Sequence, residues 1–113
     1  MRTSSERPEV TGLVARLFEL QPSEGYVATA EALTGWTARP LPRLDEVRCL
    51  AVTGDEDRYA PPEAVRAFAR TLPATTVVQV MEGCGHLPFL EQPAAFAEIV
   101  GRFMAVTCGQ APR

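Results

Sequence analysis

The sequence predicts an α/β fold, because two short apolar runs alternate with two helical patterns in its second half. The first run, residues 47–53, is nearly continuously apolar after Arg48, which is typical of a parallel strand buried on both faces. The second run, residues 76–81, has the same β-like character. Strands that alternate with helices in this way imply right-handed parallel crossovers.

Each expected strand is followed by an expected helix. The first helix begins at Pro62 and ends at Pro73. Its inward face is expected to carry Val65, Phe68 and Leu72. The second helix begins at Pro93 and has the clearest 3.6-residue period of the chain, formed by Phe96, Ile99, Val100, Phe103 and Met104. Residues 108–113 are expected to be a frayed tail.

The N-terminal part of the chain has a different rhythm, with two short helices and no strand. A helix from Pro8 carries one apolar stripe, formed by Val10, Leu13, Val14, Leu17 and Phe18. A second helix spans residues 23–33 and stops at Thr34 and Gly35. Pro40 and Pro42 predict an extended connector. We therefore place a structural boundary here, between a helical part in residues 1–40 and a core part in residues 41–113.

Composition restricts the class of protein. A chain of 113 residues with ordinary charged and apolar fractions is expected to form one globular domain. The net charge is -3 and no basic stripe exists, which argues against a nucleic-acid partner. No apolar run approaches the ~20 residues that span a bilayer, and residues 1–8 have no apolar core, so we do not expect them to be a secretory signal. The three cysteines and one histidine share no metal spacing, so we expect reduced thiols in a cytoplasmic protein with neither metal nor cofactor.

The residues that could act in catalysis lie in the two loops that follow the expected strands. In parallel sheets the working loops lie beyond the carboxyl ends of the strands. The first such loop, residues 54–62, carries acidic residues, and the second, residues 83–93, carries His86, the only histidine. A carboxylate beside an imidazole can form the second half of a nucleophilic triad, in which the acid orients the ring and the ring takes the proton of the nucleophile. Asp57 is the candidate acid, with Asp55 as the alternative, and His86 is the candidate general base.

In these two loops the sequence resembles the C-terminal part of the α/β-hydrolase family. The segments that carry the resemblance are Gly54-Asp55-Glu56-Asp57 with Pro61-Pro62, and Gly83-Cys84-Gly85-His86-Leu87-Pro88 with Glu91-Gln92-Pro93. The resemblance extends over residues 8–106 and implies a fold of two cap helices followed by strand, helix, strand and helix. It implies Asp57 as the triad acid, His86 as the base, and a cap remnant in residues 1–40. The enol-lactonase and haloperoxidase-like esterases are the most similar subgroup.

The resemblance implies hydrolysis of an ester or lactone by a triad of serine, histidine and aspartate. The family's nucleophile stands in a Gly-x-Ser-x-Gly elbow, which this sequence lacks. We therefore expect a fragment that begins inside the cap and has negligible activity alone, since the nucleophile and the oxyanion hole are both absent. Such a chain is expected to self-associate or to pair with an N-terminal half. One alternative is a non-catalytic relic or interaction module that pairs through its sheet edge, and another is epoxide or haloalkane chemistry with an aspartate nucleophile.

Four further residues have two interpretations each. Trp36 is a candidate substrate-binding residue together with Tyr26, and packing between cap and core is the alternative for both. Glu91 either orients the histidine loop by accepting backbone N–H groups or, as the sequence favours, places a charge in the first turn of a helix. Cys84 is expected to be a small buried apolar residue rather than a redox-sensitive thiol.

Overall fold

The computed structural model describes residues 7–37, 39 and 44–109. Its elements in chain order are the helices α2 (Pro8–Leu20) and α3 (Ser23–Thr34), the 3-10 turn η1 (Leu44–Glu46), strand β1 (Leu50–Gly54), helix α4 (Pro62–Ala69), strand β2 (Val77–Met81), and helices α5 (Pro88–Glu91) and α6 (Pro93–Gly109). Among the helices of these residues, none combines the length and apolar character that a membrane span requires.

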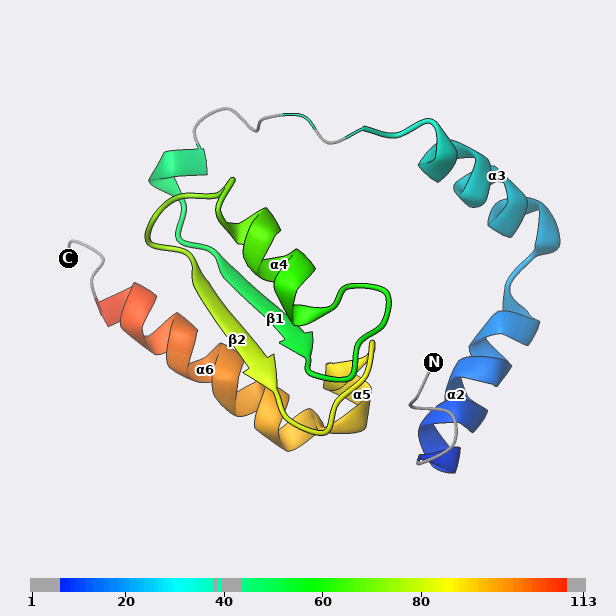
Figure 1. Cartoon of the computed structure of the whole chain (residues 1–113). Coiled ribbons are helices and arrows are strands. Elements are labelled where there is room, and N and C mark those ends of the chain that lie inside the picture. Colours follow the sequence, from blue (N-terminus) through cyan, green and yellow to red (C-terminus); the bar gives the residue numbers. More distant parts are fainter. Residues whose placement is uncertain (1–6, 38, 40–43, 110–113) are drawn as a thin grey trace.

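A small parallel sheet organises the second half of the chain, as predicted. Strands β1 and β2 pair in parallel, in a register that runs from Leu50 opposite Val77 to Gly54 opposite Met81. Helix α4 connects them and lies against one face of the sheet, while α6 runs along the other (Figure 1). On the α6 side, Ile99 and Phe103 line a cavity together with Leu50 and Val77. The parallel sheet places both strand-end loops at the same edge.

The first strand begins later than the sequence predicts, and the sheet is less buried. Val47 lies in a bend outside the strand, because its N–H group bonds to the Leu44 carbonyl at 3.0 Å and closes the 3-10 turn. The burial on both faces expected for the first strand is only partly reached, since Leu50, Ala51 and Val52 are half-buried and only Thr53 and Gly54 are buried. In β2, Val77 is 40 % exposed. The sheet that the described residues form has two strands, and each strand therefore has one unpaired edge.

Two helix boundaries also differ from the predictions. Helix α4 ends at Ala69, because the N–H groups of Thr71 and Leu72 bond three residues back, to Phe68 and Ala69. Phe68 was expected inside and is 56 % exposed. Helix α6 continues to Gly109, so the start of the expected frayed tail is helical, while residues 110–113 lie outside the described part. Helix α5, within the histidine loop, was not predicted.

The N-terminal helices form where predicted, but little covers them. The apolar stripe of α2 buries only Val10, and α3 has no buried residue. Figure 1 shows α2 beside the loops at the end of the sheet and α3 farther out. The proline-rich connector at residues 40–42 lies outside the described residues. The division into residues 1–40 and 41–113 stays a prediction.

Candidate active site

Two loops meet at the carboxyl end of the sheet. The acid loop (residues 55–61) follows β1, and the base loop (residues 82–87) follows β2. Backbone bonds join them, since Asp55 N–H donates to the Met81 carbonyl at 3.0 Å and Glu56 N–H donates to the Cys84 carbonyl at 2.9 Å. The Asp55 carboxylate also accepts the Cys84 N–H at 3.3 Å. These bonds hold the two loops together independently of Asp57 and His86.

Glycines permit this close approach. A Cβ atom at Gly54 would lie 2.1 Å from the Cys84 carbonyl oxygen, so no other residue fits between the loops without moving them. Gly83 has a φ of 67°, in the left-handed region that glycine adopts without strain. Gly54 is thus required because a side chain would clash with the base loop, and Gly83 is favoured because of its left-handed backbone conformation.

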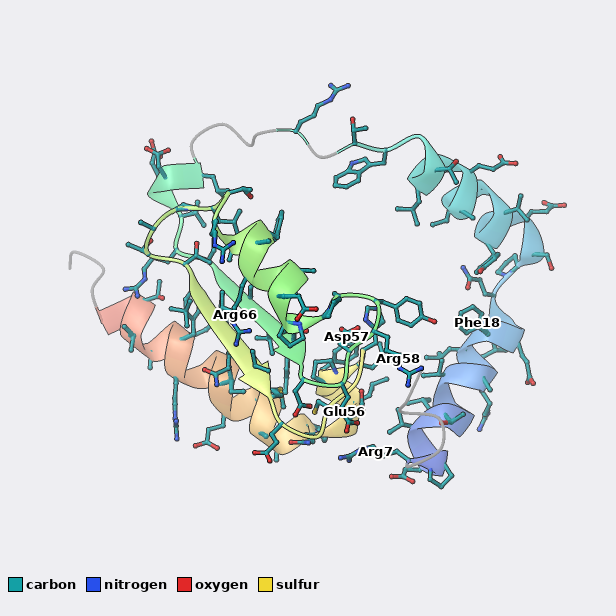
Figure 2. The ribbon with its side chains drawn as sticks, viewed as in Figure 1. Arg7, Phe18, Glu56, Asp57, Arg58 and Arg66 are labelled. Carbon is teal, nitrogen blue, oxygen red and sulfur yellow. The ribbon has the colours of Figure 1, made fainter. Side chains whose placement is uncertain are left out.

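The structure brings Asp57 and His86 together across 29 residues of sequence. The His86 Nδ1 atom lies 3.0 Å from Asp57 Oδ2 and 3.1 Å from Oδ1. Asp57 is 6 % exposed, whereas the His86 side chain is 42 % exposed. Figure 2 shows Asp57 at the end of β1, beside the base loop. Asp55, the alternative acid, bonds to the base-loop backbone instead.

Hydrogen bonds keep the Asp57 carboxylate ionised. Burial by itself would raise its pKa, but bonds from the Ala60 N–H, from His86 and from the Tyr59 N–H outweigh this effect and lower the pKa below its usual value. The two backbone bonds are 2.9 Å and 2.8 Å long and both end on Oδ1. An ionised carboxylate only accepts, so neutral His86 carries its proton on Nδ1 and Nε2 is left with a free lone pair.

Two neighbours of the pair were not singled out from the sequence. Thr53 is 2 % exposed, and its hydroxyl donates to the Ala60 carbonyl at 2.7 Å, which closes the acid loop. Its only sequence signal is a hydroxyl directly before the strand-end glycine. The Tyr59 ring lies 5.0 Å from the His86 ring, at an angle of 52°. No sequence period marks Tyr59, since it lies in an irregular loop.

Glu91 lies in the first turn of a helix, α5, as the sequence favoured, and it also bonds to the base loop, which was the other interpretation. Its side-chain oxygens accept the N–H groups of Gly85 at 2.9 Å and of Leu87 at 3.0 Å. The residue is 5 % exposed. The guanidinium of Arg7 donates to the main-chain carbonyl of Glu91 and thereby ties the start of α2 to α5, and Figure 2 shows Arg7 extending from α2 toward the loops.

Beside His86 lies an apolar cavity of about 530 Å³ between α2 and α5. Its lining includes Val14, Leu17, Phe18, Tyr59, Phe89 and Leu90. Trp36 is not part of this lining and is 68 % exposed. Tyr26 packs against Phe18, with ring centroids 6.0 Å apart. The substrate-binding role of Trp36 stays a prediction.

Cys84 is fully buried, as expected. Burial, followed by the negative charge of Glu91, raises the pKa of its thiol, which keeps the sulfur protonated. Within the part of the chain that the structure describes, no three histidine, cysteine, aspartate or glutamate side chains gather as metal ligands would.

Comparison with known proteins places this site in a family. A model of the alpha/beta hydrolase family matches residues 3–99. The uncharacterized protein Rv2715 of Mycobacterium tuberculosis is 29% identical over 108 residues, which cover 88% of this chain and 31% of that protein. The uncharacterized protein Mb2734 of Mycobacterium bovis matches to the same extent.

A further relative is named epoxide hydrolase EphH, from Mycobacterium tuberculosis, and is 34% identical over 74 residues, which cover 60% of this chain and 35% of that protein. The chain thus spans about a third of the length of these curated relatives. No solved structure matches it. The family match, which includes both loops of the site, shows that this chain belongs to the alpha/beta hydrolase family.

Proposed function

We propose that Asp57 and His86 are the acid and the general base of a hydrolase whose nucleophile and oxyanion hole lie outside these 113 residues. The observation that carries the proposal is the bond of 3.0 Å between His86 Nδ1 and a buried carboxylate at the adjacent strand end. Membership of the alpha/beta hydrolase family supports it. The nucleophile must come from elsewhere, because this sequence has no Gly-x-Ser-x-Gly elbow and Cys84 is a buried, protonated thiol.

The pair supplies the proton transfers of ester or lactone hydrolysis. His86 Nε2 takes the proton of a serine hydroxyl as its oxygen attacks the carbonyl carbon, and Asp57 stabilises the resulting imidazolium. The same Nε2–H then protonates the leaving oxygen as its bond to carbon breaks. In the second half, His86 takes a proton from water as the water oxygen attacks the acyl carbon. The bond between this carbon and the serine oxygen then breaks, and Nε2–H returns the proton to the serine oxygen as the acid leaves.

Epoxide hydrolysis is a second candidate, because one relative is named an epoxide hydrolase. Here an aspartate carboxylate outside this chain would attack a ring carbon and form a covalent ester as the ring C–O bond breaks and the ring oxygen takes up a proton from water or from an acid outside this chain. His86 would then take a proton from the water that hydrolyses this ester. The two chemistries use the same pair, and they differ in the nucleophile and in the step that needs His86.

The cavity beside His86 indicates the kind of substrate. Its lining is mainly aliphatic and aromatic, from α2 on one side and from α5 on the other. A group that enters it loses contact with water without gaining charged partners, so apolar groups are favoured. We infer that the substrate carries a hydrocarbon group next to the bond that is cleaved.

The test uses a completed protein, in which this chain is joined to the part of a family member that carries the nucleophile. Its activity is measured with p-nitrophenyl esters and with an aryl epoxide. We expect His86→Ala to lower turnover by about 10⁴–10⁶-fold, as the loss of a triad member does. The control is Glu98→Gln, which alters an exposed ion pair with Arg102 on α6. Equal activity of His86→Ala and the unchanged protein would overturn the proposal.

Mass spectrometry of the His86→Ala protein separates the two chemistries. With an aspartate nucleophile, the covalent ester still forms from the epoxide and accumulates, because His86 acts only on the water. With a serine nucleophile, no covalent acyl-enzyme builds up, because its formation already needs the base.

A further inference from the structure

We propose that Glu91 is a positioning residue for His86, which it orients by holding the backbone on both sides of that residue. The inference rests on the proposed role of His86 as general base. Glu91 does not touch the reacting atoms, and it acts through the geometry of the base loop.

The bonding pattern is specific to the residues that flank His86. One carboxylate oxygen of Glu91 accepts the N–H of Gly85, the residue before His86, at 2.9 Å. The other accepts the N–H of Leu87, the residue after it, at 3.0 Å. With both neighbours held, the Cα–Cβ direction of His86 is set, and the ring is directed at Asp57.

The short helix α5 places this carboxylate. Leu87 precedes α5, and the N–H of Glu91 bonds back to the Leu87 carbonyl at 2.9 Å, which forms one helical turn. This turn folds the Glu91 side chain back under the loop from which the helix starts. Arg7 binds the main-chain carbonyl of Glu91, so its hydrogen bond does not compete with those of the two carboxylate oxygens.

The burial of the Glu91 carboxylate makes its two hydrogen bonds to the base loop costly to break. The residue is 5 % exposed, and a buried carboxylate without hydrogen bonds is strongly disfavoured. The two backbone donors satisfy it only while Gly85 and Leu87 keep their positions. Any movement of the base loop that turns His86 away from Asp57 therefore also breaks bonds to a buried charge.

The test compares two substitutions with two controls. Glu91→Gln keeps the shape but replaces one acceptor by an NH₂ donor that faces a backbone N–H. Glu91→Asp keeps the charge, but it is one methylene shorter and cannot reach both N–H groups. Gln92→Ala removes a different anchor of the same loop, the bond of 2.9 Å to the Glu82 carbonyl. Glu98→Gln changes only an exposed pair.

The first readout is spectroscopic and needs no substrate. The completed protein is assembled from this chain, labelled with ¹⁵N-histidine, and an unlabelled remainder. Since His86 is the only histidine of this chain, the label reports on that ring alone. We expect the unchanged chain and both controls to hold the proton on Nδ1. We expect Glu91→Gln and Glu91→Asp to move toward the tautomer mixture of free histidine. In the unchanged chain, the Gly85 and Leu87 amides should exchange more slowly with solvent than the amide of Glu82.

The second readout is turnover in the completed protein. We expect both Glu91 variants to lower kcat by about 10²-fold with little change in KM, as a displacement of about 1 Å does. Gln92→Ala should keep kcat within about twofold.

Two results would overturn the inference. They are folded Glu91 variants in which His86 keeps its Nδ1 proton and normal kcat, or fast exchange of the Gly85 and Leu87 amides in the unchanged chain. A failure of the proposed function looks different, because it leaves the His86 signals as expected while His86→Ala remains active.

Discussion

At the scale of single residues, the environment of Asp57 decides the protonation of the Asp57–His86 pair. Burial opposes its charge, yet the N–H groups of Tyr59 and Ala60 and the His86 ring keep its pKa low. The ionised carboxylate therefore accepts a hydrogen bond from His86 Nδ1–H and orients the ring in this way. The proton stays on the ring. A general base needs this arrangement, because it leaves Nε2 free for the proton of the nucleophile.

Asp57→Asn should reverse the tautomer of His86. The amide group of asparagine can donate to Nδ1, and the ring proton then moves to Nε2, where it blocks the base. We expect ¹⁵N spectra of the completed protein, with the histidine label in this chain only, to show Nε2 protonated, and its turnover to fall by about 10⁴-fold. An unchanged tautomer, or turnover within tenfold of normal, would contradict this prediction.

Stability should depend on pH through Asp57. Its folded-state pKa lies below the unfolded value, which is ~3.9 for an aspartate. Ionised Asp57 therefore stabilises the folded state above about pH 4, and this contribution is lost as the pH falls through the folded-state pKa. In urea unfolding of the completed protein, the difference between the unchanged protein and Asp57→Asn should be constant from pH 7 to 5 and shrink below pH 4. A difference that persists to pH 2 would contradict the assignment.

At the scale of elements, the site is a contact between two strand ends. The parallel register places Gly54 opposite Met81, so that the acid loop and the base loop leave the sheet side by side. Backbone bonds and the absence of a Cβ atom at Gly54 keep them in contact. The distance between Asp57 and His86 is therefore set by the sheet and its glycine, and not only by the two side chains.

Gly54→Ala should disrupt this contact. Its Cβ atom would lie 2.1 Å from a backbone oxygen, which cannot move like a flexible side chain. We expect a loss of about 3 kcal/mol or more in the free energy of unfolding, at the upper end for overpacked sites. Gly101→Ala in α6 is the matched control, since no atom lies within 4 Å of its Cβ position, and it should gain ~0.5–1 kcal/mol. Urea unfolding of the completed protein measures both, and similar effects of the two variants would contradict the steric argument.

At the scale of the whole molecule, the chain is more open than a compact domain. Its radius of gyration is 16.6 Å, whereas a compact domain of about 100 residues has ~13 Å. Large apolar side chains remain uncovered, such as Leu17 at 55 % and Leu33 at 66 % exposure. This open form accords with a chain that spans about a third of its relatives.

We expect the chain alone to associate through these apolar surfaces and its unpaired strand edges. Size-exclusion chromatography should show species larger than a 12.3 kDa monomer, with strong binding of a hydrophobic dye. In the completed protein, both the association and the dye binding should disappear. A compact monomer with a cooperative thermal transition would contradict this prediction. A defined dimer that does not combine with the rest of the fold would favour the interaction module.

The sequence by itself determined the local features of this protein. The helices α2 and α3, the alternation of strands and helices, and the loops with Asp57 and His86 all follow from periodicity, proline positions and strand-end glycines. The tertiary structure decided what depends on side-chain contacts and burial. It paired Asp57, rather than Asp55, with His86, it turned Glu91 toward the base loop, and it left Phe68 outside. The sheet register joins Asp57 and His86 across 29 positions, whereas the turn of α5 joins Glu91 to residues only six and four positions away. Neither these contacts nor the exposure of Phe68 leaves a period in the sequence.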